Sequence, residues 1–195
     1  MGTGTPAQRR PMRADARRNR KRLLAEAAAA FAEHGMDFSL EEIARRAGVA
    51  NGTLYGHFPT RRALLEALLG DRMRALAGTG EELLADPSPF DGLTAWTREA
   101  LAHATLYRGL GAALMQAVEN EASELHAACQ AVLAAGDALV ARAREAGEVR
   151  PDVTARDVFA LVTAVAWASE QSSELQGERL LAFTLDGFRA PPALP

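Results

Sequence analysis

The chain has 195 residues, of which 48% are hydrophobic and 24% charged, so it is long enough for a small globular domain joined to a larger one. The single cysteine, Cys129, excludes an internal disulfide framework and fits a reducing compartment. No apolar run reaches the roughly eighteen residues of a membrane span, and no signal-peptide core follows the basic N-terminus, so we expect a soluble, cytoplasmic protein with no membrane partner.

Charge divides the chain unevenly. Residues 1–62 carry twelve Lys and Arg against six Asp and Glu, whereas the remaining residues carry ten against nineteen. Eight of the basic residues fall within the first 22 positions. This asymmetry predicts two modules, of which the basic one meets a polyanion. The alternative is a solvated N-terminal tail without function.

A first helix is expected from about residue 14, because Leu and Ala recur at spacings of three and four. Gly35 ends it as a C-terminal cap would. Residues 1–13 show no such periodicity, so we expect a disordered basic tail there.

Two short helices are expected next. Ser39 is a good N-cap, and Glu42 three residues later completes a capping box for a helix that ends at Gly48. The second short helix covers residues 51–58, and Pro59 ends it.

A longer helix follows Thr60, and the chain is expected to break at Gly78, Gly80 and the Pro-rich segment 86–89. Beyond that point only helical patterns occur, at about residues 90–106, 109–120, 122–146, 154–172 and 178–189. Thr154 and Asp157 form a plausible cap for the fourth of these. No stretch alternates as a strand does, so the sequence predicts an all-α protein.

Two short helices joined by a tight turn are typical of the helix-turn-helix motif, whose second helix enters the DNA major groove. Asn51 stands at the start of the second helix, where its amide can pair with a base edge, best with adenine. Thr53, Tyr55 and His57 supply hydroxyl and imidazole groups suited to phosphate oxygens.

The remaining residues of this segment fit the same role. Gly52 and Gly56 keep the helix surface thin, so that its backbone can approach the groove floor. Leu54 and Phe58 are spaced to point back into the core. Arg61 begins the next helix near the same DNA backbone.

Residues 17–65 resemble the DNA-binding domain of TetR-family transcriptional regulators, through "RRNRKRLLAEAAAAFAEHG" followed by "SLEEIARRAGVANGTLYGHFPTRRALL". The resemblance implies a three-helix helix-turn-helix DNA-binding domain at 14–62 and a larger helical ligand-binding and dimerisation domain at 63–190. It also implies a homodimeric regulator, expected to be a repressor, that binds a palindromic double-stranded DNA operator and is released by a small-molecule effector.

The resemblance also implies DNA contacts. Ser39 and Thr53 would contact the backbone, Tyr55 and His57 would hold phosphates, and Arg61 replaces a lysine with that role. The whole candidate set is Arg17, Arg18, Arg20, Ser39, Asn51, Gly52, Thr53, Tyr55, Gly56, His57 and Arg61.

Two positions depart from the family pattern. Ala50 replaces a serine, so a hydroxyl cap is lost at the start of the second short helix. Glu41 stands where some members place a basic residue that reads bases. A carboxylate there could accept only from a cytosine amine, or it would avoid the groove.

The acidic remainder offers weaker signals. Polar and aromatic residues on otherwise apolar helices are candidates for effector binding: Trp96, His103, Tyr107, Met115, Gln116, Glu119, His126 and Trp167. Each of them could equally be an ordinary core or surface residue. Apolar residues of the last two helices are candidates for a four-helix dimer interface: Phe159, Leu161, Val162, Val165, Ala166, Leu181, Phe183, Leu185 and Phe188. The alternative is a wide face buried within the monomer.

Enzyme functions find no support in the sequence. The four histidines show no metal-binding spacing, and no nucleophile elbow, P-loop or dinucleotide fingerprint occurs, so we expect no metal, cofactor or catalytic residue. Two rival functions remain open: a constitutive DNA-binding regulator without an effector, and a small-molecule-binding protein on the same fold. The sequence does not specify the operator, the effector, the regulated genes, or repression against activation.

Overall fold

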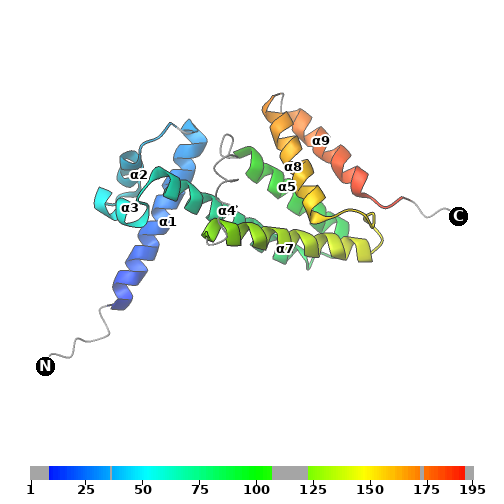
Figure 1. Ribbon diagram of the computed structural model, residues 1–195, viewed down its shortest axis with the longest axis horizontal. Helices are drawn as coiled ribbons and strands as arrows, with labels where there is room; N and C mark the ends of the chain where they lie inside the picture. The colour runs from blue at the N-terminus through cyan, green and yellow to red at the C-terminus, as the bar shows by residue number, and fades with distance from the viewer. Residues whose placement is uncertain (1–8, 36, 107–122, 172–173, 192–195) are drawn as a thin grey trace. The chain divides into compact units, whose positions relative to one another are not determined.

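The computed structural model describes residues 9–35, 37–106, 123–171 and 174–191, and eight helices lie within these ranges (Figure 1). No strand occurs among these residues, apart from an isolated bridge between Val149 and Arg189. The predicted all-α fold class is therefore confirmed. None of the described helices is long and apolar enough to cross a membrane.

The chain divides into two compact units, residues 1–68 and 69–195. The division falls within α4 (Arg61–Leu83), which contributes residues to both units. It lies six residues beyond residue 62, where the sequence placed the end of the first domain. Each unit has its own buried side chains, and they are described separately.

In the first unit, α1 (Arg9–His34) packs against α2 (Leu40–Ala47) and α3 (Asn51–His57), and these two short helices pack against each other (Figure 1). Helix α1 begins at Arg9, five residues before its predicted start near residue 14. Pro11 lies in the first helical turn, where its missing N–H has no partner to lose and the helix tolerates it. Residues 1–8 lie outside the described residues.

The caps of this unit follow the sequence closely. Gly35 and Gly48 adopt the left-handed conformation at the ends of α1 and α2, as predicted for C-terminal caps. The Ser39 hydroxyl accepts from the backbone N–H of Glu42 at 3.0 Å. The reciprocal half of the predicted capping box is missing, because the Glu42 carboxylate instead pairs with Arg45.

Arg46 fastens α2 to α1. Its guanidinium donates to Glu26 at 3.0 Å and to Glu33 at 2.9 Å, and both carboxylates belong to α1. Because the Arg46 side chain is three-quarters buried, these charge-assisted bonds are less screened than an exposed pair would be. They fix the helix that precedes the turn.

Helix α4 continues through Gly78 and Gly80 to Leu83, so the predicted break at these glycines was wrong. A Cβ atom at Gly80 would lie 2.9 Å from the indole nitrogen of Trp96 and 2.9 Å from the Cβ of Ala135. Glycine is therefore present at residue 80 because neighbouring side chains approach the helix, and it does not end the helix.

The second unit contains α5 (Pro89–Leu106), α7 (Glu124–Glu145), α8 (Ala155–Glu170) and α9 (Glu174–Phe188). Helix α5 packs against α7 and α8, and α8 lies beside α9 (Figure 1). The predicted Thr154–Asp157 cap is confirmed as a complete capping box. The predicted helix at 109–120 lies outside the described residues.

Candidate nucleic-acid interface

Helix α3 presents polar residues to solvent and anchors itself by its apolar ones. Leu54 and Phe58 are buried in the core of the first unit, as predicted, whereas Asn51 and Gly52 are exposed at the start of the helix. Burying a side chain such as Leu54 contributes about 1.5–3 kcal/mol. The N-cap residue Ala50 makes no side-chain hydrogen bond, which confirms that the hydroxyl cap is lost.

The outer side of α3 is open. A Cβ atom added at Gly52 or Gly56 would meet no other atom within 4 Å. Neither glycine has a positive φ angle, so backbone conformation does not require glycine there. Packing within the chain therefore does not require glycine at either position. Close approach of a ligand such as DNA would explain both.

Tyr55 is 42% exposed, but its hydroxyl is already engaged. It donates a hydrogen bond of 2.6 Å to Oε1 of Glu41, which joins α3 to α2. This bond lowers the pKa of the Glu41 carboxyl and raises the pKa of the Tyr55 phenol. The phosphate contact expected of Tyr55 would require this bond to break, because a hydroxyl has a single proton to donate.

Three further polar residues of the candidate set lie on α3 or just before α2. Thr53 and His57 are half-buried, and the Ser39 hydroxyl accepts from the Glu42 N–H while its own proton is directed to the Glu41 carboxylate, whose pKa it helps to lower. Thr53 and His57 carry groups that can donate to phosphate oxygens, whereas Ser39 would have to give up its bond to Glu41 to do so.

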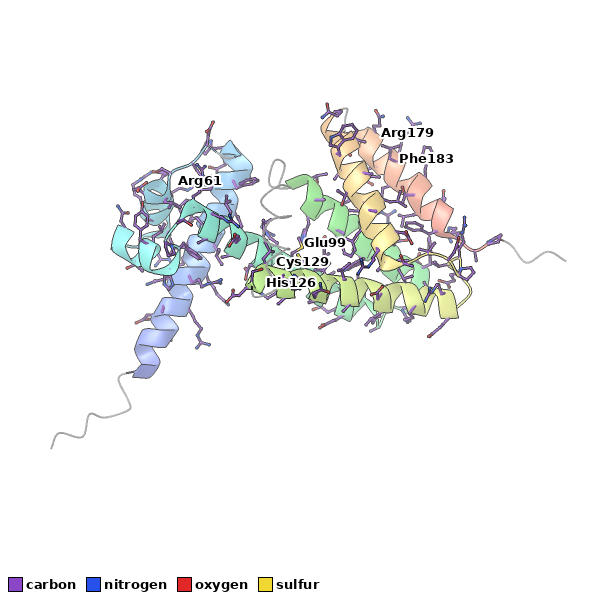
Figure 2. The ribbon with its side chains drawn as sticks, viewed as in Figure 1. Arg61, Glu99, His126, Cys129, Arg179 and Phe183 are labelled. Atoms are coloured by element: carbon purple, nitrogen blue, oxygen red, sulfur yellow. The ribbon has the colours of Figure 1, made fainter. Side chains whose placement is uncertain are left out.

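The side chain of Arg61 is less available than expected for a residue that holds a phosphate. Its guanidinium stacks over the ring of Phe38, with the central carbon 4.3 Å from the ring centroid. Its Nε and Nη2 atoms are buried without a hydrogen-bond partner, which leaves Nη1 as the nitrogen able to reach a phosphate. Figure 2 shows Arg61 at the start of α4.

The basic residues of α1 are in three different environments. Arg17 is exposed, Arg18 pairs with Asp15 one turn earlier, and Arg20 lies over the ring of Phe58 at 5.7 Å. The pair with Asp15 is exposed and is worth at most about 1 kcal/mol, so Arg18 can exchange it for a phosphate.

In the second unit, the effector candidates separate into core and surface residues. Trp96 is completely buried, its indole N–H donates to the Leu76 carbonyl at 3.1 Å, and its ring meets Phe159 edge-on. Trp167, in contrast, is 66% exposed on α8. Tyr107, Met115, Gln116 and Glu119 lie outside the described residues.

The two histidines of that set differ as well. His103 is only 8% exposed; its Nε2 lies 3.2 Å from the Glu99 carboxylate, and its Nδ1 has no partner. Burial lowers the pKa of the His103 imidazole, against the opposing effect of Glu99. His126 is half-buried at the start of α7, and Figure 2 labels it together with Glu99 and Cys129.

Most of the residues predicted for the dimer interface are buried within the monomer. The core of the second unit buries six of them: Val162, Val165, Ala166, Leu181, Leu185 and Phe188. Phe159 is half-buried against the same core, so these seven side chains do not form the outer surface of α8 and α9. Phe183 is 63% exposed, and Leu161 is also exposed.

The differences between the residues expected in the dimer interface and their observed positions have one cause. Apolar periodicity identifies the side of a helix that is buried, but it does not tell a monomer core from a dimer interface. The large apolar residues exposed on α8 and α9 in the described chain are Leu161, Trp167 and Phe183, and Trp167 had been assigned to effector binding.

Metal or thiol chemistry gains no support. No group of three or more His, Cys, Asp or Glu residues within the described ranges is arranged to hold a metal. Burial raises the pKa of the Cys129 thiol, which disfavours the reactive thiolate.

Two family models match the chain. The model described as bacterial regulatory proteins, tetR family, matches residues 23–68, and thus the second half of α1, all of α2 and α3, and the start of α4. The model described as the transcriptional regulator SbtR-like C-terminal domain matches residues 88–190, slightly more than half of the chain.

Among solved structures, a TetR transcriptional regulator from Streptomyces coelicolor is 40% identical, with a TM-score of 0.71; the match covers 89% of this chain and 99% of that one. The transcriptional repressor KstR2 of Mycolicibacterium smegmatis is 27% identical over 191 residues, covering 87% of this chain and 90% of the repressor. The helix-turn-helix regulator TtgW of Pseudomonas putida, itself uncharacterised, is 38% identical over 64 residues, which are 32% of this chain and 48% of that relative. This last match therefore spans only about half of the relative.

Proposed function

The chain belongs to the TetR family of DNA-binding transcriptional regulators, and we propose that it binds a near-palindromic operator as a homodimer and is released by a small-molecule effector. The observation that carries the proposal is the outer side of α3. It combines an exposed Asn51 with two glycines that no neighbouring side chain approaches.

In this proposal α3 lies in the major groove. Asn51 pairs with a base edge, best with adenine, while Gly52 and Gly56 let the backbone approach the groove floor. Thr53 and His57 donate to phosphates and fix the orientation of the helix, and the Ser39 hydroxyl can join them by exchanging its bond to Glu41 for one to a phosphate.

The basic residues of α1 supply affinity that does not depend on sequence. Arg17, Arg18 and Arg20 are proposed to contact phosphates beside the groove, and such contacts release counterions. Binding should therefore weaken steeply as the salt concentration rises, in proportion to the number of phosphates neutralised.

A second copy of the chain is proposed to cover the outer face of α8 and α9. Trp167 and Phe183 are each more than 60% exposed, and large exposed apolar side chains favour burial against a partner. Figure 2 shows Phe183 one turn from Arg179 on α9. Exposed Ala160, Ala164 and Ala182 would let helices from the two protomers approach closely. In the proposed two-fold dimer the two α3 helices would have to lie about 34 Å apart to enter successive major grooves.

The effector is proposed to hydrogen-bond to His103. Because burial lowers the pKa of this imidazole, the ring is neutral near pH 7, and the Glu99 carboxylate places the ring proton on Nε2. Nδ1 is then a buried acceptor without a partner, which is costly unless a donor reaches it. An effector with a hydroxyl or N–H group would supply that donor.

Release of the operator then follows from linkage. An effector that lowers operator affinity about 100-fold must favour the non-binding conformation by about 2.7 kcal/mol. Helix α4 contributes residues to both units, so it is the element through which we propose the two sites are coupled.

A constitutive regulator without an effector is the second candidate. The full burial of Trp96, with its indole N–H bonded to Leu76, favours it, because this large side chain fills part of the second unit itself. A ligand screen on the operator-bound protein separates the two candidates.

Selection from a pool of random duplexes tests the proposal. The purified protein should enrich a near-palindrome, and Asn51→Ala should alter its base preferences while leaving the half-site spacing unchanged. Enrichment of no sequence, with only salt-sensitive binding, would overturn operator recognition.

A further inference from the structure

Glu41 and Tyr55 form a hydrogen-bonded pair at the surface of the first unit. Neither the packing of the unit nor binding to DNA phosphates explains this pair. The phenol hydroxyl donates to the carboxylate over 2.6 Å, at the short distances typical of a charge-assisted O–H···O⁻ bond. The bond joins α2 to α3, and both residues are exposed. It therefore lies at the surface of the helix-turn-helix motif.

Among the described glutamates of the first unit, Glu41 differs from the others in the residue to which its side chain bonds. Glu26 and Glu33 are neutralised by Arg46, Glu42 by Arg45 and Glu66 by Arg62. Glu41 makes no ion pair in the described chain; its carboxylate accepts from the Tyr55 hydroxyl and, as a weaker contribution to its lowered pKa, from the Ser39 hydroxyl. Its negative charge therefore remains uncompensated on a unit whose other charges are mainly basic.

The pair offers only acceptors to a ligand. The phenol proton is committed to the carboxylate, and an ionised carboxylate has no proton of its own. The hydrogen bond also lowers the pKa of Glu41 and raises that of Tyr55, so the carboxylate stays charged and the phenol stays protonated at neutral pH. Phosphate oxygens are acceptors too, and they carry negative charge, so the pair does not suit a phosphate.

The donors that DNA displays in the major groove are exocyclic amines. Cytosine presents its N4 amine, and adenine presents its N6 amine beside the N7 acceptor. A carboxylate suits cytosine better, because N7 of adenine would face it with a second lone pair. Glu and Asp side chains accept from cytosine N4 in the pairings that geometry favours.

We propose that Glu41, held in place by the Tyr55 hydroxyl, determines base specificity by accepting a hydrogen bond from a cytosine amine in each half-site. The inference rests on the proposed function, in which α3 occupies the major groove. It assigns Tyr55 to positioning Glu41 rather than to holding a phosphate. A helix N-terminus also favours acidic residues, but that effect would not create a preference for one base.

Duplex selection with matched variants tests the inference. Glu41→Gln converts the carboxylate to an amide, which suits the N6 and N7 groups of adenine. One position per half-site should therefore change from cytosine to adenine, with a loss of about tenfold in cytosine preference. Tyr55→Phe keeps the ring and should weaken the same preference. Glu42→Gln, whose parent carboxylate is paired with Arg45, should leave base frequencies unchanged.

The outcomes separate the inference from the function on which it rests. If the wild-type protein enriches no sequence, operator recognition itself fails. If it enriches a palindrome and Glu41→Gln enriches the same bases, the function stands and the inference is overturned. A uniform gain in affinity of Glu41→Gln for all duplexes would also overturn it, because Glu41 would then only repel phosphates.

A titration without DNA checks the pair itself. Tyr107 is the only other tyrosine, so a Tyr107→Phe background isolates the ultraviolet signal of the Tyr55 phenol. Glu41→Gln should lower the pKa of Tyr55 towards its ordinary value, whereas Glu42→Gln should not. An unchanged pKa of Tyr55 in Glu41→Gln would contradict the positioning role.

Discussion

The indole of Trp96 lies against Gly80, so closely that a methyl group at residue 80 would sit 2.9 Å from the indole nitrogen. Trp96 also limits residue 136, where an added Cβ would lie 2.6 Å from its ring. Glycines on α4 and α7 thus make room for one large side chain of α5. This arrangement explains the glycine at residue 80 within the continuous helix α4.

Gly80→Ala should lower the free energy of unfolding by about 1–3 kcal/mol, because the added methyl group overpacks the core around Trp96. Gly78→Ala is the matched control on the same helix. A Cβ at residue 78 meets no other atom within 4 Å, so this change should raise stability by about 0.5–1 kcal/mol. Urea denaturation measures both values, and equal effects of the two changes would contradict the packing described.

Gly56→Ala should separate stability from DNA binding. A Cβ there meets nothing within 4 Å, so alanine should stabilise α3 by about 0.5–1 kcal/mol. The same methyl group should weaken operator binding, because it holds the helix away from the groove floor. Thermal denaturation and operator titration are measured on one preparation. A gain in both quantities would remove the reason proposed for this glycine.

Phe183→Glu should convert the proposed dimer to a monomer. A charge at an exposed apolar position costs little in the monomer, whereas its desolvation at the centre of an interface costs about 2–4 kcal/mol. Sedimentation equilibrium measures the change. Arg98→Glu on α5 also replaces an exposed side chain with glutamate and should leave association unchanged. Unaltered dimerisation of Phe183→Glu would place the interface elsewhere.

Stability should fall as the pH drops through about 6.5, the ordinary pKa of histidine. The folded state lowers the pKa of His103, so below that pH the unfolded chain binds a proton that the folded protein does not. The loss should end once the folded imidazole is protonated too, and amounts to about 1.4 kcal/mol for each unit between the two pKa values. His103→Asn should flatten the pH dependence of urea denaturation. Identical slopes for both proteins would rule out the contribution of this histidine.

The first unit could be predicted from sequence in most respects because its signals are local. Ser39, Gly35 and Gly48 act through hydrogen bonds or φ angles within a few residues of themselves. The Glu41–Tyr55 bond joins residues fourteen positions apart in different helices, so no spacing rule indicated it.

The second unit was less predictable because its side chains meet across several helices. The sequence offered Trp96 and Trp167 as equivalent candidates for a ligand site. One is fully buried and hydrogen-bonded to α4, whereas the other is exposed on α8. Which apolar side of a helix faces the core depends on the neighbouring helices, and periodicity alone does not contain that information.

The most direct test of sequence-specific DNA binding is the ratio of two dissociation constants at one fixed salt concentration. One is for the duplex enriched by selection, and the other is for a scrambled duplex of the same length. Specific recognition by α3 predicts a ratio of at least about 10³ in favour of the selected duplex. Nearly equal constants, both weakening alike with added salt, would mean that the basic residues of α1 bind the DNA backbone and that α3 reads no sequence.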